Sequence, residues 1–108
     1  MDVRISARHC TITDSTRDLA RRRVDRVARI EPRASAAEIL FSAENAFKHA
    51  EIRMTVPGGV QLHSHGEAES FRSALDRAAE RLERQLRRRR GRTRDRRAAP
   101  AAEAMQTS

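Results

Sequence analysis

Along four short stretches of the chain, apolar and polar residues alternate, which is the period of a β-strand with one buried face. These stretches are Val3–Ala7, Ala37–Ala43, Ala50–Val56 and a segment opened by Val60, Leu62 and Ser64. The turn residues Pro57, Gly58 and Gly59 separate the last two stretches and predict a hairpin. None of the four is a long continuous apolar run, so the pattern favours a sheet whose second face is open to solvent.

Two further stretches repeat their apolar residues at the spacing of an α-helix. The first has Thr13 as its predicted N-cap, carries Asp14 in its first turn and ends before Pro32. The second begins at the predicted cap Ser70 and is expected to stop at Gly91. The two apolar stripes are Leu19, Ala20, Val24, Val27 and Ile30, and then Phe71, Ala74, Leu75, Ala78, Leu82 and Leu86.

Taken in chain order, these elements predict a β-α-β-β-β-α arrangement, an α+β fold with a four-stranded sheet and two helices on one face. The helices are expected to run roughly parallel, because each element reverses the direction of the one before it. A chain of 108 residues suits a single core. We therefore expect a folded domain over residues 1–91. Residues 92–108 are basic and then rich in alanine, without periodicity, and are predicted to be a disordered tail.

The positive charge of the chain is concentrated towards its C-terminal end. The formal net charge is +8, and 22 of the 23 basic residues are arginines. Residues 81–97 hold ten arginines and two acidic residues, so this segment accounts for the whole excess. Arginine stays charged at any biological pH and presents a planar fork of donors suited to phosphate. The uncompensated run Arg87–Arg90 predicts a polyanionic partner, because four adjacent like charges repel one another.

Helical periodicity gathers the arginines of each predicted helix on one flank of its apolar stripe, at about 100° per residue. The flank of the second helix holds Arg77, Arg81, Arg84 and Arg88, and that of the first helix holds Arg22, Arg26 and Arg29. The acidic residues Asp76, Glu80 and Glu83 are expected to face away from the core. Because both flanks are displaced in the same rotational sense, parallel helices would form a grooved positive surface from them.

The same charges also fit a structural explanation, in which they form solvated i,i+4 pairs on exposed helices. Four pairs have this spacing: Asp18–Arg22, Asp25–Arg29, Glu80–Arg84 and Glu83–Arg87. Each would stabilise its helix by on the order of a few tenths of a kcal/mol. For any single arginine of the set, an ion pair and a ligand contact fit the sequence equally well.

The scarcity of aromatic residues narrows the kind of polyanion. Modules that read single strands stack bases on exposed rings, but this chain has three phenylalanines and neither tryptophan nor tyrosine. Phe41 and Phe71 fall in apolar registers, which leaves Phe47, in the turn before the third strand, as the candidate exposed ring. Arginine without aromatic residues indicates contacts to phosphate and helical shape rather than to base identity. Structured RNA fits best, with duplex DNA as the alternative.

No constellation of residues points to catalysis, and the sequence predicts neither an enzyme nor a cofactor. His63, His65 and Glu67 share one face of a strand and would need a further ligand, such as His49, to hold a metal. A strand His-x-His is common by chance, so no metal is expected. The single cysteine, Cys10, is expected to be a small, half-buried packing residue and not a catalytic nucleophile.

The distribution of apolar residues also limits where the protein acts. The chain has no charge-free apolar run long enough to cross a bilayer. Charged residues near the N-terminus occupy positions where a signal peptide would need an uninterrupted apolar segment. We therefore expect a soluble cytoplasmic protein with no membrane partner and no small-molecule substrate.

Three parts of the chain match one family pattern in the order of the predicted elements. They are Val3–Arg8 leading to Ile12–Asp14; Glu44 and Asn45 followed by His49–Ile52 and Val56–Gly59; and Ser70–Asp76 followed by Leu82–Leu86. Over roughly residues 1–92 the chain thereby resembles the hibernation-promoting factor and ribosome-associated inhibitor family of bacteria.

The resemblance implies a β-α-β-β-β-α fold and a partner, the small ribosomal subunit with its 16S rRNA. It implies a protein that occupies the channel of mRNA and tRNA anticodon stems and stalls translation by occlusion when growth slows. Long members of the family carry a further C-terminal domain that pairs ribosomes, which this chain is expected to lack. The basic positions of the family match Arg23, Arg26, Arg81, Arg84, Arg88 and Arg90.

Periodicity, the basic run and the resemblance together give the predicted rRNA-binding residues. These are Arg22, Arg23, Arg26, Arg29, Arg77, Arg81, Arg84, Arg87, Arg88 and Arg90. They favour a translation inhibitor that acts on the ribosome during hibernation under stress. The alternative function is a general double-stranded RNA-binding module or RNA chaperone that acts away from the ribosome.

Overall fold

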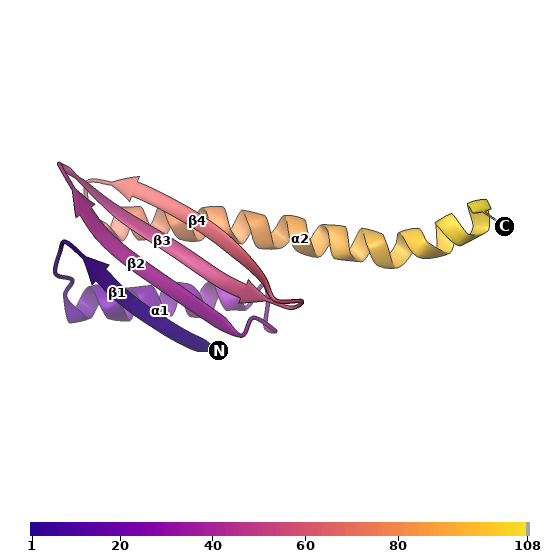
Figure 1. Cartoon of the computed structure of the whole chain (residues 1–108), viewed down its shortest axis with the longest axis horizontal. Coiled ribbons are helices and arrows are strands. Elements are labelled where there is room, and N and C mark those ends of the chain that lie inside the picture. The colour runs from indigo at the N-terminus through magenta and orange to yellow at the C-terminus, as the bar shows by residue number, and fades with distance from the viewer. Residues whose placement is uncertain (108) are drawn as a thin grey trace.

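Two layers make up the fold, a four-stranded sheet and a pair of helices packed on one of its faces (Figure 1). The computed structural model describes the backbone of residues 1–107 and the side chains of residues 1–91. The strands are β1 (Asp2–Arg8), β2 (Ala36–Glu44), β3 (Phe47–Val56) and β4 (Val60–Ala68), and the helices are α1 (Asp14–Ala28) and α2 (Phe71–Thr107). The predicted element order and the α+β fold class are confirmed.

The strands lie side by side in the order β1-β2-β3-β4. β1 pairs with β2 in parallel, because α1 returns the chain to the starting end of the sheet before β2 begins. β3 pairs in antiparallel fashion with both β2 and β4. β4 therefore runs in the same direction as β1. Each of these two strands is followed by a helix that runs in the opposite direction. The two helices lie parallel on the same face of the sheet, as predicted (Figure 1).

Along most of the central strands β2 and β3, every second residue is buried beneath the helices. Ile39 of β2 lies opposite Ile52 of β3, and neither has more than 1% of its surface exposed. Phe41 is fully buried and meets Phe71 edge-on, with the ring centroids 5.6 Å apart. The helices contribute Ala20, Val24, Val27, Ala74, Leu75, Ala78, Ala79, Leu82 and Leu86 to this core. Both predicted apolar stripes therefore face the sheet.

Left-handed backbone conformations close the two hairpins. Asn45, in the connection between β2 and β3, has φ 57°, a region in which asparagine is tolerated. Gly58 and Gly59, between β3 and β4, have φ 88° and 72°, which glycine adopts at no steric cost. The turn predicted at residues 57–59 is therefore confirmed.

β4 approaches α2 very closely at Gly66. A Cβ atom at this position would lie 2.0 Å from the carbonyl oxygen of Ala74 and 2.7 Å from the backbone nitrogen of Ala78. Both atoms belong to the helix backbone and have no side-chain freedom with which to move away. Glycine is therefore required for this packing, which fixes how α2 lies along β4.

The start of the third strand differs from that expected. β3 begins at Phe47, which lies opposite Glu44 in the β2–β3 pair, so Phe47 belongs to the strand and not to the turn. Pairing with β2 therefore extends β3 beyond the stretch that alternates in hydrophobicity. β4 runs past His63, His65 and Glu67, which were expected to share one strand, and ends at Ala68, where it is paired with Lys48 of β3.

The end of the second helix also differs from the expectation. α2 does not stop at Gly91 but continues to Thr107. An interior glycine costs a helix about 1 kcal/mol, and arginine, which favours helix, flanks Gly91 on both sides. The division into a folded domain, residues 1–91, and a disordered tail, 92–108, stays a prediction, because the side chains of that tail lie outside the described residues.

Candidate nucleic-acid interface

The arginines of α1 stand on a helix whose start and inner face follow from the sequence. The Thr13 side chain accepts a hydrogen bond from the Thr16 backbone nitrogen at 3.2 Å, which confirms the predicted N-cap. Val24 is buried against the sheet. At about 100° per residue, Arg22 and Arg29 then lie on the opposite side of the helix, and both are exposed.

Two ion pairs join the two helices. Arg23 is paired with Asp76, and Nε of Arg26 lies 3.8 Å from Oε1 of Glu83. The Glu83 side chain is only 15% exposed. Asp76 and Glu83 therefore face α1, and the expectation that they face away from the core is wrong. Residues seven apart share one side of a helix, and α1 packs on that side of α2.

A third predicted arginine also joins the helices. Nη1 of Arg90 donates a hydrogen bond to the carbonyl oxygen of Ile30 at 3.1 Å. Ile30 lies just beyond the C-terminal end of α1, where carbonyl groups lack helical partners. Arg90 thus satisfies one of these acceptors and fixes the end of α1 against α2.

Another side of α2 donates hydrogen bonds to backbone carbonyl groups of β4 and of the turn before it. The donor–acceptor pairs are Arg77–Glu67, Arg81–His65, Gln85–His63 and Arg89–Pro57. β4 is the last strand of the sheet, so carbonyl groups on its outer side have no neighbouring strand. The side chains of α2 take that place and cover the edge.

This arrangement depends on a match between two repeats. Four residues of helix rise about 6 Å and two residues of strand about 6.6 Å, so donors four apart stay opposite carbonyls two apart. Arg77 and Arg81, two of the predicted rRNA-binding residues, hydrogen-bond the sheet edge, and their contact with rRNA stays a prediction. The contact of Gln85 with the sheet edge is not predicted by the sequence analysis. The signal for it is a row of long polar side chains, at positions 77, 81, 85 and 89, beside the apolar stripe of the helix.

Five of the predicted arginines are exposed, and their side chains form no hydrogen bond or ion pair within the part of the chain whose side chains are described. They are Arg22 and Arg29 of α1 and Arg84, Arg87 and Arg88 of α2. Helical periodicity places all five outside the buried stripes, with Arg84 and Arg88 on the same flank of α2 as Arg77 and Arg81. We call these five residues the outer arginine surface.

The i,i+4 pairs that offered a structural explanation for these arginines are not formed among the described side chains. Neither Asp18–Arg22, Asp25–Arg29, Glu80–Arg84 nor Glu83–Arg87 is an ion pair within 4 Å. Glu83 is instead paired with Arg26 of the other helix. The outer arginine surface therefore keeps its charge uncompensated by direct contacts.

An exposed guanidinium without a protein partner keeps all five of its N–H donors available. Its planar fork matches two oxygens of one phosphate, and its charge cannot be removed at neutral pH. Several such groups on one surface fit the repeated negative charge of a nucleic-acid backbone. The outer arginine surface is therefore the candidate anion-binding surface among the described residues.

The phenylalanines are placed largely as the sequence suggested. Phe41 is buried, and Phe71 packs against the core with the Lys48 Nζ atom 5.3 Å from its ring centroid. Phe47 is 45% exposed. One exposed ring, distant in sequence from the arginines, does not form a platform for stacking successive bases.

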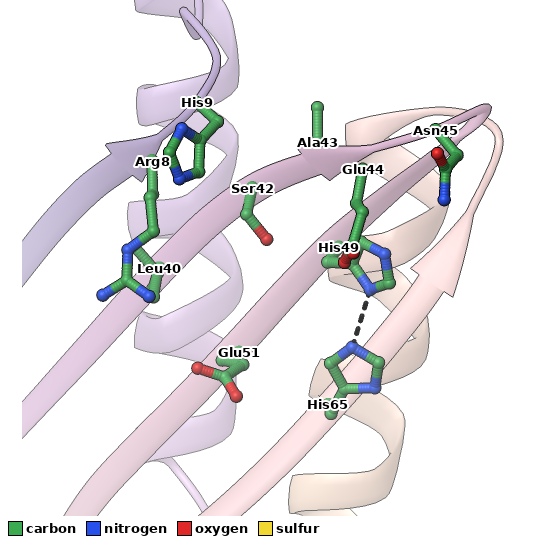
Figure 2. A pocket seen from close by; sticks show the side chains of 10 residues that line it. All are labelled: Arg8, His9, Leu40, Ser42, Ala43, Glu44, Asn45, His49, Glu51 and His65. Atoms are coloured by element: carbon green, nitrogen blue, oxygen red, sulfur yellow. Dashed lines mark hydrogen bonds between the residues drawn. The ribbon is translucent and has the colours of Figure 1, made fainter.

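The open face of the sheet carries a small cluster of histidines and glutamates (Figure 2). His49 Nδ1 and His65 Nε2 lie 3.0 Å apart, and their rings stack with centroids 5.2 Å apart. Glu67 Oε2 lies 4.0 Å from His49 Nδ1, whereas His63 Nε2 lies 3.3 Å from Glu51 Oε1. The predicted common face is confirmed, but His63 interacts with a different neighbour from that of His65.

A shallow hollow of about 650 Å³ lies beside this cluster. Figure 2 shows Arg8 and His9 on one side of the hollow and the stacked pair His49 and His65 on the other. Glu51 also contributes to the lining. The mixture of signs suits neither a strong anion nor a strong cation, so the hollow does not compete with the arginines as the anion site.

Other features of the described residues limit the remaining chemistry. No group of three histidine, cysteine, aspartate or glutamate side chains among them is arranged to hold a metal ion. Cys10 is half-buried, with its Sγ 3.7 Å from the carbonyl oxygen of Phe41. No helix within the described part is both long and apolar enough to cross a membrane.

Comparison with known families and proteins gives consistent matches. The family model described as Sigma 54 modulation protein / S30EA ribosomal protein matches residues 3–94. A ribosome hibernation promoting factor from Pseudomonas putida is 28% identical over 86 residues, which cover 80% of this chain and 83% of the relative. A protein of the same name from Azotobacter vinelandii is also 28% identical over 86 residues, covering 80% and 79% of the two chains.

Solved structures show the same fold. A ribosomal subunit interface protein from Coxiella burnetii has a TM-score of 0.79 at 19% identity, covering 84% of this chain and 99% of its own. The N-terminal domain of Thermus thermophilus Protein Y has a TM-score of 0.72 at 30% identity, covering 82% and 98%.

Proposed function

Because this chain belongs to the Sigma 54 modulation protein / S30EA ribosomal protein family, we propose that it is a ribosome hibernation factor that binds the small ribosomal subunit. The family resemblance expected from the sequence is confirmed. Two relatives carry the name ribosome hibernation promoting factor, and a structural neighbour is a ribosomal subunit interface protein. These names support a ribosomal partner, and the arginines support rRNA as the component contacted.

The outer arginine surface is the observation that carries this proposal. Arg22, Arg29, Arg84, Arg87 and Arg88 project from two parallel helices and have no protein partner among the described side chains. Two helical rows held at a fixed separation suit the phosphate backbone of a folded RNA, which presents negative charge as a ribbon. The core residues that both helices bury against the sheet hold that separation.

The proposed mechanism requires no covalent step. The domain would dock its helical layer on 16S rRNA, and its volume would exclude mRNA and tRNA anticodon stems from their sites. In this proposal no residue acts on a substrate, and neither catalysis nor a cofactor is needed. The site of action would be the cytoplasm, in cells whose growth has slowed.

A matched pair of variants tests the proposal. Replacing Arg22, Arg84 and Arg88 by Gln removes three charges from the outer arginine surface, and replacing Arg4, Arg33 and Arg53 by Gln removes three exposed charges elsewhere. The first variant should lose co-sedimentation with small subunits and inhibition of translation in a cell extract, whereas the second should keep both. Equal binding by the two variants would contradict the proposal.

A general double-stranded RNA-binding module is the second candidate. Helical rows of arginine without a stacking platform recognise phosphate and shape, and any RNA duplex offers both. Competition separates the two functions: an unrelated RNA hairpin in excess should leave small-subunit binding largely intact for a hibernation factor. Displacement by the hairpin at comparable concentration would favour the general module.

A further inference from the structure

The two edge strands of the sheet, β1 and β4, differ in how far side chains cover their outward-facing peptide groups. On the β4 edge, three side chains of α2 donate hydrogen bonds to carbonyl groups of the strand. On the β1 edge, one contact of this kind is present among the described side chains, from Arg17 Nη1 to the carbonyl oxygen of Ile5 at 3.4 Å. β1 therefore presents a row of peptide groups that a further strand can reach.

The backbone hydrogen bonds show which peptide groups of β1 point outwards. The Asp2 backbone nitrogen donates to the carbonyl oxygen of Ser35, on the side of β2. Peptide groups alternate in direction along a strand, so the even-numbered residues of β1 face β2. The N–H and C=O groups of Val3, Ile5 and Ala7 therefore face away from the sheet. The position of the Ile5 carbonyl oxygen, within reach of Arg17, agrees with this alternation.

The sequence of β1 is self-complementary when two copies pair in antiparallel fashion about Ile5. In that register the three outward residues lie opposite one another, Val3 opposite Ala7 and Ile5 opposite Ile5. Each such pair exchanges two backbone hydrogen bonds, as hydrogen-bonded antiparallel pairs do. On the open face, Asp2 lies opposite Arg8, so opposite charges meet at both ends of the paired strands.

We propose that the β1 edge binds the β1 edge of a second copy of this chain, forming a symmetric dimer with a continuous eight-stranded sheet. The two-fold axis passes between the two Ile5 residues, perpendicular to the sheet. All four helices then lie on one side, and the half-exposed Val3 and Ile5 lose contact with water. The Arg17 guanidinium leaves the Ile5 carbonyl oxygen as the partner strand arrives.

A second copy fits this edge better than an unrelated strand does. The two ends of β1 carry opposite charges, Asp2 and Arg8, so each end complements the other across a two-fold axis, and Arg4 lies opposite the uncharged Ser6. Arg8 is exposed and has no ion-pair partner within the described residues, so it is available to Asp2 of the other copy. Asp2 lies 3.4 Å from Arg4 on its own strand and is 65% exposed.

The dimer goes beyond the proposed ribosomal function and uses a different surface. β1 and the outer arginine surface lie on separate parts of the molecule, so a variant of one leaves the other unchanged. Loss of the dimer and loss of ribosome binding are therefore separate outcomes. Neither the sedimentation of the free protein nor its response to β1 substitutions depends on RNA.

Sedimentation velocity of the purified full chain, at fixed ionic strength and over a series of concentrations, tests the proposal. The protein should pass from monomer to dimer as its concentration rises. Either D2R or R8D places like charges opposite each other at two positions, and should weaken the dimer by about tenfold or more. The double variant D2R/R8D restores opposite charges and should recover the dimer.

Two further variants control for effects on folding. Ala7→Pro removes one outward N–H without touching the hydrogen bonds to β2, and should abolish the dimer while the circular dichroism spectrum is retained. Arg53→Asp reverses a charge on the same open face but away from the edge, and should leave the dimer unchanged. A wild-type chain that stays monomeric at every concentration overturns the proposal. A double variant D2R/R8D that dimerises no more strongly than D2R or R8D alone also overturns the proposal, because Asp2 and Arg8 then do not lie opposite each other in the dimer.

Discussion

The guanidinium of Arg81 donates a hydrogen bond to the carbonyl oxygen of His65, on the outer side of β4. The contact joins a helix side chain to the backbone of the edge strand and fills an acceptor that no neighbouring strand reaches. Arg81 therefore helps to hold α2 along the sheet. Arg84, three residues further on, is exposed and has no partner among the described side chains.

Substitution of these two arginines should separate stability from binding. Arg81→Ala removes a charged donor to a backbone carbonyl and should lower the free energy of unfolding by about 1 kcal/mol. Arg84→Ala should change that free energy by less than about 0.5 kcal/mol, as exposed substitutions usually do, while weakening RNA binding. Urea denaturation and co-sedimentation with small subunits measure the two effects. Equal stability of both variants would argue against the structural role of Arg81.

Gly66→Ala should be among the most damaging single substitutions in the domain. The added Cβ would lie 2.0 Å from the carbonyl oxygen of Ala74, so α2 must move away from β4. Such overpacking against backbone should cost about 3 kcal/mol or more. Gly91→Ala is the matched control, because nothing lies within 4 Å of its added Cβ. Thermal unfolding should show a large loss for the first variant and a small gain for the second.

Ser64→Ala should leave the domain unchanged or make it more stable. The hydroxyl of Ser64 is buried in the core, 4% exposed, and has no hydrogen-bond partner among the described groups. Removing an unsatisfied buried hydroxyl relieves a desolvation cost of about 1 kcal/mol. Chemical denaturation measures the change, and a clear loss of stability would reveal a hydrogen bond to this hydroxyl.

Glu83→Gln should strengthen RNA binding at a small cost in stability. Glu83 pairs with Arg26 at 3.8 Å, and its removal leaves the Arg26 charge free to act on a polyanion. Affinity for small subunits should rise by roughly two- to tenfold, while unfolding becomes easier by at most about 1 kcal/mol. Filter binding and denaturation test the two parts, and weaker binding would show that the ion pair positions Arg26 for contact.

The element order and the core follow from local sequence signals. Alternation along residues 37–43 predicts that Ile39 and Phe41 share a buried face, and helical spacing predicts the burial of Leu75 and Leu82; all four are buried. The cap at Thr13 is local too, because its side chain reaches a backbone nitrogen three residues away. Such signals need no knowledge of which elements become neighbours.

Which arginines contact the sheet or the other helix, and which stay exposed, depends on tertiary neighbours and could not be predicted from the sequence. Periodicity places Arg77 and Arg81 on the same flank as Arg84, but only the position of β4 decides which of them meet its carbonyl groups. Likewise the i,i+4 spacing predicts an ion pair between Glu83 and Arg87, but the packing of α1 against α2 places Glu83 next to Arg26 instead. Charged side chains are long enough to choose between partners, so spacing alone does not fix their contacts.

The salt dependence of binding to purified small ribosomal subunits tests the central claim most directly. Five phosphate contacts from the outer arginine surface predict a loss of affinity of about 10²–10³ between about 50 and 200 mM monovalent salt. Each of Arg22, Arg29, Arg84, Arg87 and Arg88, when replaced by Gln, should reduce the slope of log affinity against log salt by roughly one unit. A slope that is near zero, or that is unchanged in these variants, would contradict the account.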